Sequence, residues 1–200
     1  MKDTVREMDI KDAILDATGR LLARLGYKKM TIEGLAGEVG IGKGSIYLHF
    51  SSKEEIALSH IDRIIEQLKE NLNIIAAKNI SCEDRLKQML VERVMFRFDS
   101  VQNYSQNLDD LLAQIRPKLL ERRKRYFIEE ARILARVIEE GKNTGVLAGE
   151  DPLESAKTLL SATNSLLPFS LSTSELGKRA AIEKKVRLIS DMLLNGLIAR

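Results

Sequence analysis

Apolar residues recur every three or four positions along most of this 200-residue chain, as they do on the buried face of an amphipathic helix. No stretch of the sequence alternates apolar and polar residues in the manner of a half-buried strand. Alanine, leucine, isoleucine, glutamate, lysine and arginine dominate, which favours helix over sheet. The sequence therefore predicts an all-α fold of about nine helices, over residues 10–25, 32–39, 43–49, 53–76, 81–98, 108–115, 117–140, 152–167 and 175–198.

Boundary signals support several of these predicted helices. A glycine commonly ends a helix, whereas Ser, Thr or Asp begins one by accepting a hydrogen bond from a free backbone N–H. Proline fits the first turn, because the N–H that it lacks would have no partner there. The signals are Gly26 as a stop, Thr31 and Ser81 as N-caps, Ser52 with Glu55 as a capping box, Pro117 in a first turn, and Asp151 followed by Pro152.

The chain offers little that an enzyme would need. It holds two histidines and one cysteine, with no phosphate loop, metal-ligand cluster or nucleophile–base pair, so we expect no enzymatic activity, cofactor or metal. His60 and Cys82 show no ligand spacing, and a lone cysteine suits a reducing compartment. The sequence has no apolar run long enough to cross a membrane and no signal peptide, which predicts a cytoplasmic protein without a membrane partner.

The segment GEVGIGKGSIYLHFSSKEE, residues 37–55, contains the turn between two short predicted helices. Two short helices joined by a glycine-containing turn form a helix-turn-helix, whose second helix lies in the major groove of DNA. Small residues at the start of that helix, Gly42, Gly44 and Ser45, would let its backbone come close to the duplex. The pattern therefore indicates a DNA-binding segment.

Side-chain direction and charge agree with this interpretation. Ile46 and Phe50 are four positions apart and should face the core, whereas Tyr47 and Leu48 should face outward or sideways. Between residues 20 and 53, six side chains are basic and two are acidic. Such an excess suits a surface that faces phosphates, although an ordinary solvated face would explain the charge equally well.

The stretch TIEGLAGEVGIGKGSIYLHFSSKEE resembles the signature of the tetracycline-repressor (TetR) family of transcription regulators. The resemblance rests on Thr31, Leu35, Ala36, Gly40, Ile41, Lys43, Gly44, Ser45, Ile46, Tyr47, His49, Phe50, Lys53 and Glu54. It covers the first quarter of the chain, and the rest agrees in length and helical character. It implies a three-helix helix-turn-helix domain over residues 1–52 and a larger helical domain for ligand binding and dimerisation over residues 53–200.

The resemblance also implies a function. Members of this family bind double-stranded DNA as homodimers at near-palindromic operators, usually repress nearby genes, and release the DNA when a small-molecule effector binds the C-terminal domain. Whether this chain represses or activates depends on where its operator lies. The alternative is an architectural DNA-binding protein of the same fold that responds to no effector, which a C-terminal domain without a cavity would favour.

Carried over by position, the resemblance assigns DNA contacts to eight residues. The resemblance places Lys43, Gly44 and Ser45 at the entry to the major groove. Phosphate contacts fall to Thr31, Tyr47, His49 and Lys53. Gly42 stands where the family often has Ser or Thr, which would cap the helix and touch phosphate; glycine brings no side chain for this. Plainer roles exist for Tyr47 in the core, for His49 on the surface, and for Lys53 as an ordinary first-turn lysine.

The last predicted helix carries a packing seam. Its apolar residues are spaced four, three, four and three apart, with a second apolar flank beside them. The seam is Ile182, Val186, Ile189, Leu193 and Gly196, and the flank is Leu188, Leu194 and Ile198. In the TetR family the last two helices of each subunit form a four-helix bundle across the dimer, so the resemblance predicts that interface here. The alternative is that both faces are buried within one subunit.

Candidate effector-binding residues are spread over the C-terminal half. They are Met89, Arg93, Phe96, Tyr104, Leu108, Tyr126, Phe127 and Asn164. Aromatic and methionine side chains at helical spacing are more often plain core. Arg93 and Arg97 are four positions apart, and on an inner face they could hold a carboxylate or phosphate between them. We expect instead that they lie on an outer face in solvent.

Overall fold

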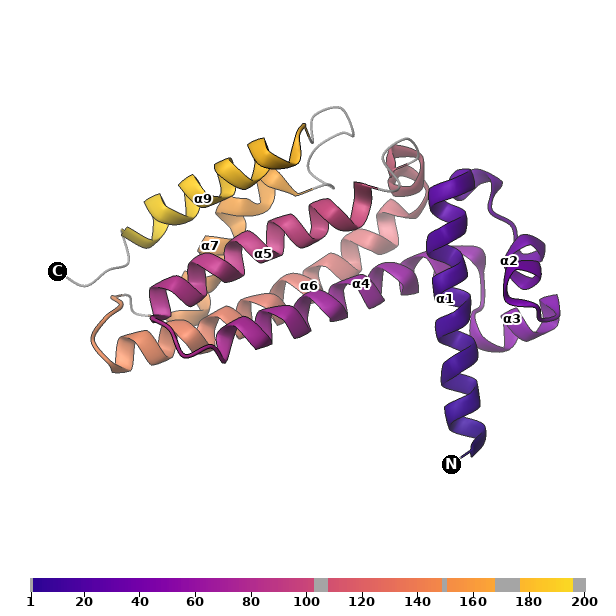
Figure 1. Cartoon of the computed structure of the whole chain (residues 1–200), viewed down its shortest axis with the longest axis horizontal. Coiled ribbons are helices and arrows are strands. Elements are labelled where there is room, and N and C mark those ends of the chain that lie inside the picture. The colour runs from indigo at the N-terminus through magenta and orange to yellow at the C-terminus, as the bar shows by residue number, and fades with distance from the viewer. Residues whose placement is uncertain (1, 103–107, 149–150, 168–176, 196–200) are drawn as a thin grey trace. The chain divides into compact units, whose positions relative to one another are not determined.

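The computed structural model describes residues 2–102, 108–148, 151–167 and 177–195, and for residues 2–8 and 108–110 it describes the backbone alone. These residues form eight α-helices and one 3-10 turn, with no β-strand among them (Figure 1), so the predicted all-α fold is confirmed. The elements are α1 (Lys2–Lys29), α2 (Ile32–Val39), α3 (Lys43–His49), α4 (Lys53–Ala76), α5 (Cys82–Gln102), α6 (Leu108–Asn143), α7 (Pro152–Thr163), η1 (Asn164–Leu166) and α9 (Arg179–Asn195). No helix in the described ranges has the length and apolar content that a bilayer crossing requires.

The chain forms two compact units. The first comprises Met1–Ile64 with Asn103–Leu119, and the second comprises Ile65–Gln102 with Leu120–Arg200. Helices α4 and α6 each begin in the first unit and end in the second. The predicted division into residues 1–52 and 53–200 is a functional one, and it stays a prediction.

In the first unit, α2 packs on α1 and on α3 (Figure 1), and Arg63 of α4 pairs with Asp12 and Asp16 of α1. Their inward side chains are fully or almost fully buried: Ile14, Leu21, Leu22, Leu35, Ile46, Phe50, Ile56 and Leu58. Gly26 has a φ of 74°, a left-handed value that interrupts the helical backbone of α1 near its end. The stop predicted at this glycine is therefore a real break, and the chain turns there toward α2.

Hydrogen bonds fix the ends of the short helices where the sequence predicts them. The Thr31 hydroxyl accepts a bond from the N–H of Gly34 at 3.0 Å, which caps α2. At the other end of α2, Gly40 has a φ of 76° and donates its N–H to the carbonyl of Ala36. The Ser52 hydroxyl accepts from the N–H of Glu55 at 3.1 Å and so caps α4. These caps hold α2 and α3 on either side of a tight turn.

In the second unit, α5 packs against α9 and α7 (Figure 1). The core includes Leu68, Leu72, Leu86, Met89, Leu90, Leu134, Val137, Ile138, Leu159, Leu160 and Leu194. Arg85 adds a polar clamp: its Nη1 donates to the carbonyl of Ala76 at 2.8 Å, and its two Nη atoms donate to the Glu140 carboxylate at 2.8 and 2.6 Å. One guanidinium thus ties the end of α4 to the last turns of α6.

Two predicted boundaries are wrong. The segments 108–115 and 117–140 are one helix, α6, with Pro117 inside it. Leu111, Ile115 and Leu119 are buried and spaced four apart, so the apolar stripe continues through the proline and its packing offsets the lost backbone hydrogen bond. This merger accounts for eight helices instead of nine. Helix α5 also continues to Gln102, into residues predicted to be a loop.

Candidate nucleic-acid interface

Helix α3 has one buried face and one exposed face. Ile46 is fully buried and Phe50 is 4% exposed, whereas Tyr47 is 49% exposed and Leu48 is 84% exposed. The spacing of Ile46 and Phe50 puts both on the core side of the helix, and their neighbours must then point outward. The predicted directions of all four side chains are confirmed. An exposed leucine and tyrosine on a seven-residue helix leave an apolar surface that faces solvent.

The glycines at the start of α3 are not required by internal packing. Gly42 is the N-cap residue in an extended conformation, with a φ of −73°, and its carbonyl accepts the N–H of Ser45 at 3.0 Å. A Cβ atom added at Gly42 or at Gly44 would meet no atom within 4 Å. Neither position has a positive φ. The absence of side chains here therefore clears space outside the protein, over the first turn of α3.

Lys43 in the first turn of α3 is hydrogen-bonded to Glu33 in the first turn of α2. Both side chains are exposed, at 50% and 64%. The bond raises the pKa of Lys43 and lowers the pKa of Glu33. Because exposed ion pairs contribute little to stability, Lys43 can exchange this carboxylate for another anion at small cost. Glu33 was not among the predicted site residues.

Lys53 lies differently from the other predicted phosphate contacts. Its ammonium group donates to the carbonyls of Tyr27 and Met30 at 2.9 and 3.0 Å, and burial lowers the pKa of Lys53. Thr31 is exposed, although its hydroxyl oxygen caps α2, while Ser45 and His49 are half-buried. The eight predicted DNA contacts thus lie at the start of α2, along α3 from its N-cap to its last residue, and at the start of α4, with Lys53 already engaged by the protein.

Two further arginines of the first unit lie across α1 and α2. Arg20 Nε and Arg24 Nη2 donate to the two carboxylate oxygens of Glu38 at 3.1 and 3.0 Å, and these bonds lower the pKa of Glu38. Both arginines remain more than half exposed. The pairing holds α2 to α1 on the solvent side.

The predicted effector-binding residues are mostly part of the second unit's core. Met89 is fully buried, Tyr126 is 3% exposed, and Phe96 and Phe127 are half-buried against the same core. Asn164 accepts a hydrogen bond from Arg93 Nη2 at 2.9 Å. Tyr104 lies outside the described residues, and for Leu108 only the backbone is described. Met89, Phe96, Phe127 and Arg93 therefore belong to one packed region.

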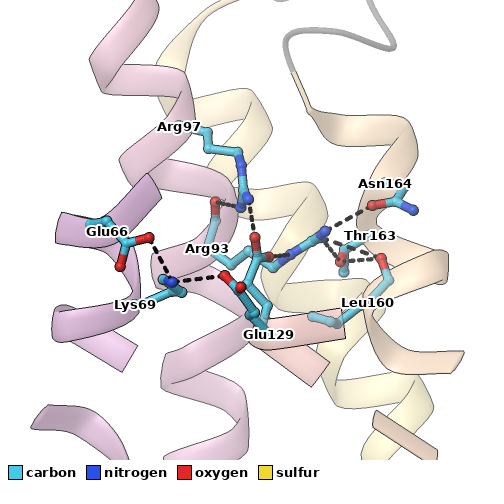
Figure 2. Close-up of polar contacts among 9 residues, drawn as sticks. Glu66, Lys69, Arg93, Arg97, Glu129, Leu160, Thr163 and Asn164 are labelled. Carbon is cyan, nitrogen blue, oxygen red and sulfur yellow. Dashed lines mark hydrogen bonds and ion pairs between the residues drawn. The ribbon is translucent and has the colours of Figure 1, made fainter. Parts of the chain in front are cut away.

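The expectation that Arg93 and Arg97 lie in solvent is wrong. Arg93 is 2% exposed and Arg97 is 6% exposed, because their face of α5 is turned toward α6 and α7. Both donate to the carboxylate of Glu130, which is fully buried (Figure 2). Glu130 was not predicted as a site residue. In the part of the chain that the structure describes, no group of three or more His, Cys, Asp or Glu side chains could hold a metal ion.

The helix-turn-helix of residues 31–53 lies within a segment that also matches a known protein family. Residues 14–59 match the family model of bacterial regulatory proteins, tetR family. This segment is a tetR-family N-terminal region. The resemblance predicted from the turn and from α3 is confirmed, and the matched range reaches from α1 into α4.

Curated relatives match this chain over part of its length and over part of theirs. The uncharacterized HTH-type transcriptional regulator YerO of Bacillus subtilis (strain 168) is 32% identical over 108 residues, which are 52% of this chain and 35% of that protein. The biofilm operon icaADBC HTH-type negative transcriptional regulator IcaR of Staphylococcus aureus (strain Newman) is 32% identical over 95 residues, which are 48% of this chain and 50% of IcaR. The alignments therefore span half or less of these two relatives.

The structural likeness extends further. The crystal structure of a transcriptional regulator of the TetR/AcrR family from Thermobifida fusca has a TM-score of 0.67 with 25% identity, covering 94% of this chain and 98% of that one. The tetR-type fold thus includes the second unit as well as the matched N-terminal region.

Proposed function

We propose that this chain is a sequence-specific, DNA-binding transcriptional regulator that acts as a repressor. The observation that carries the proposal is the exposed surface of α3, where Tyr47 and Leu48 project beside two glycines that leave the first turn open. A helix that is buried on one side and uncovered on the other can enter the major groove. IcaR, a relative over part of its length, is named as a negative regulator, which favours repression.

In this proposal the first unit contacts DNA through the predicted residues. Lys43, Gly44 and Ser45 approach base edges in the major groove, with Gly42 beside them. The phosphate contacts are Thr31, Tyr47, His49 and Lys53. Lys43 leaves Glu33 for the DNA, because an exposed ion pair costs little to break and DNA is strongly negative. Such a protein would act in the cytoplasm, where bacterial DNA is found.

The proposed regulator is a homodimer, because a near-palindromic operator presents two half-sites. Helix α9 supports this part of the proposal. Ile182, Val186 and Leu194 are buried, yet Leu188 is 59% exposed and Met192 is 69% exposed on the opposite side. A second copy that packs α7 and α9 against this helix would cover both. Sedimentation should find a dimer for the wild type and a monomer for the double variant Leu188→Glu, Met192→Glu; a dimer in both would contradict the interface.

The proposed effector is a small molecule that binds the second unit among the core residues around Arg93. It must bind the DNA-free state more tightly than the DNA-bound state, because a ligand with equal affinity for both states does not shift the equilibrium between them. Helices α4 and α6 each begin in the first unit and end in the second, so both are covalent routes between the two sites. If no effector binds, the alternative is an architectural DNA-binding protein of the same fold.

The test begins by selecting duplexes from a random library with the full-length chain. Fluorescence anisotropy then measures their affinity for the wild type, Lys43→Ala and Tyr47→Ala. Each variant should bind more weakly, and Lys43→Ala should also reduce the slope of log affinity against log salt by about one, since one positive charge beside the DNA is lost. The matched control is Lys157→Ala, a lysine of α7 that pairs with Glu154.

Two results would contradict the proposal. One is that selection enriches no duplex sequence. The other is that both α3 variants bind as tightly as the wild type and the Lys157→Ala control.

A further inference from the structure

The second unit contains two buried guanidinium groups that share one carboxylate. Arg93 Nε donates to Glu130 Oε2 at 2.7 Å, and Arg97 Nη2 donates to Glu130 Oε1 (Figure 2). The three side chains are at most 7% exposed. Two positive charges therefore face a single negative charge inside the helical bundle. Buried charges are costly unless they are paired, so the second guanidinium calls for a further anion.

The hydrogen bonds distinguish the two arginines. Arg93 uses all three of its nitrogens: besides Glu130, its Nη1 donates to the Thr163 hydroxyl at 3.1 Å and to the Leu160 carbonyl at 3.3 Å, and its Nη2 donates to Asn164 at 2.9 Å (Figure 2). These bonds cross from α5 to α6, α7 and η1. Arg93 is therefore a structural link in which each of the three guanidinium nitrogens has a partner.

The guanidinium of Arg97 makes fewer hydrogen bonds than that of Arg93. Apart from Glu130, it has one long bond of 3.4 Å from Nη1 to the carbonyl of Arg93, and its buried Nε atom has no hydrogen-bond partner among the described residues. A buried donor without a partner is unusual, and it costs more on a charged group than on a neutral one. The Nε side of the Arg97 guanidinium thus lacks an acceptor in the described part of the chain.

The neighbouring charges do not supply this acceptor. The carboxylate of Glu129 accepts from Lys69 Nζ at 2.7 Å, and Lys69 also pairs with Glu66 (Figure 2). Burial lowers the pKa of Arg93, and the nearby charges of Arg97 and Arg123 lower it further. None of these neighbouring groups gives the Nε atom of Arg97 an acceptor within the described residues.

We propose that the Nε side of the Arg97 guanidinium, which has no partner among the described residues, binds the anionic group of the effector, and that the effector is an organic anion with an apolar body. This inference rests on the proposed function, because it names the chemical class of that effector. The anionic group is a carboxylate or a phosphate monoester, since both accept charge-assisted hydrogen bonds from a guanidinium. The apolar body follows from the setting: Leu160 and Ala131, next to the bonded groups, belong to the apolar core, with Phe96 and Phe127 packed against it.

The test is calorimetric titration of the full-length chain, without DNA, by four probes. Octanoate and octyl phosphate carry the two candidate headgroups, octanamide is the neutral match of octanoate, and inorganic phosphate lacks the apolar body. At least one octyl anion should bind at least about tenfold more tightly than octanamide, as expected for a charge-assisted hydrogen bond. The tighter of the two identifies the headgroup. Inorganic phosphate should bind at least about tenfold more weakly than octyl phosphate, because each buried CH₂ adds to the affinity.

Variants of Arg97 locate the site. Arg97→Gln should reduce the affinity for the octyl anion to that for octanamide, and Arg97→Lys, which keeps the charge but not the Nε donor, should give an intermediate affinity. The matched control is Arg132→Gln: Arg132 is exposed on α6, two positions from Glu130, and its replacement should leave the affinity unchanged. If Arg97→Gln does not fold, titration of the wild type with octanoate, octyl phosphate and octanamide still tests whether an anionic headgroup strengthens binding.

The inference would be overturned if neither octyl anion bound more tightly than octanamide, or if a folded Arg97→Gln variant kept the wild-type affinity. If inorganic phosphate bound as tightly as octyl phosphate, the proposal that the effector has an apolar body would be contradicted. The DNA assay is separate, because ligand-free Arg97→Gln should still bind DNA. A wild type that binds octanoate but no DNA would contradict the proposed function, whereas DNA binding without anion binding would contradict this inference alone.

Discussion

The ammonium nitrogen of Lys53 lies 2.9 Å from the carbonyl oxygen of Tyr27 and 4.4 Å from the centre of the Tyr27 ring. It also donates to the carbonyl of Met30 at 3.0 Å. A lysine in the first turn of α4 thus holds the segment that follows the break at Gly26. In this way Lys53 helps to set where α2 begins.

Replacement of Lys53 should therefore destabilise the first unit. Lys53→Met keeps the stem that packs on Tyr27 but leaves two carbonyls without this donor, at a cost of about 1–3 kcal/mol in the free energy of unfolding. Urea unfolding monitored by circular dichroism measures the loss. Lys118→Met is the control, because Lys118 forms an exposed pair with Glu54, and it should cost less than about 1 kcal/mol. Equal stability of Lys53→Met and the wild type would contradict the role of Lys53.

Stability should depend on pH through His60. Burial, together with the nearby charge of Arg63, lowers the pKa of His60 to about 4 from the ordinary value of 6.5. Between these values the unfolded chain binds a proton at His60 that the folded chain does not, so stability falls as the pH drops from 6.5 to 4. The loss is about 3 kcal/mol for a shift of this size.

The comparison of wild type with His60→Gln isolates this contribution, since the carboxylates titrate in both proteins. The difference in the free energy of unfolding between them should change across the window from pH 6.5 to 4 and be constant above it. A difference that is the same at every pH would contradict the assignment.

Gly141 allows a close contact at the end of α6. A Cβ atom there would lie 2.5 Å from Leu147 Cδ1 and 2.7 Å from Leu147 Cγ. Leu147 is 4% exposed and accordingly has little room to move, so Gly141→Ala should destabilise the protein by about 1–3 kcal/mol. Gly37→Ala is the matched change: its Cβ would meet nothing within 4 Å, and it should stabilise α2 by about 0.5–1 kcal/mol. Thermal unfolding should give shifts of opposite sign; shifts of the same sign would contradict this account.

The Arg85 clamp should matter more than its exposed partner suggests. Glu140 is 54% exposed, yet Arg85 is buried and also holds the carbonyl of Ala76. Arg85→Met should cost about 2–3 kcal/mol in the free energy of unfolding, because the carbonyl at the end of α4 loses its side-chain donor. Arg132→Met, which changes an exposed arginine, should cost less than about 0.5 kcal/mol. Chemical denaturation of both variants decides, and equal losses would contradict the clamp.

Local chemistry made much of the first unit predictable. Thr31 and Ser52 accept backbone hydrogen bonds where their positions before helical patterns indicate, and Gly26 breaks α1 because of its own conformational freedom. The directions of Ile46 and Phe50 follow from helical spacing alone. Each of these features depends on residues within about one turn, which the sequence displays directly.

Features that depend on distant partners could not be predicted in the same way. Arg93 meets Glu130 from 37 positions away, and α5 has several apolar faces, so spacing did not tell which side of the helix was buried. Pro117 was expected to begin a helix because proline fits the first turn, and the burial of Leu111, Ile115 and Leu119 around it is known only from the folded chain. Lys53 reaches back 26 positions to Tyr27, which no local pattern indicates.

The most direct test of the central claim is the DNA affinity of Gly44→Leu. A Cβ atom at this position meets no atom within 4 Å, so we expect the variant to fold as the wild type does, while its side chain fills the space over the first turn of α3. Anisotropy with the selected duplex should show at least about a tenfold loss of affinity, or about 1.4 kcal/mol, for Gly44→Leu and wild-type affinity for Gly37→Leu on α2. Wild-type affinity of a folded Gly44→Leu variant would contradict the claim that this face of α3 contacts DNA.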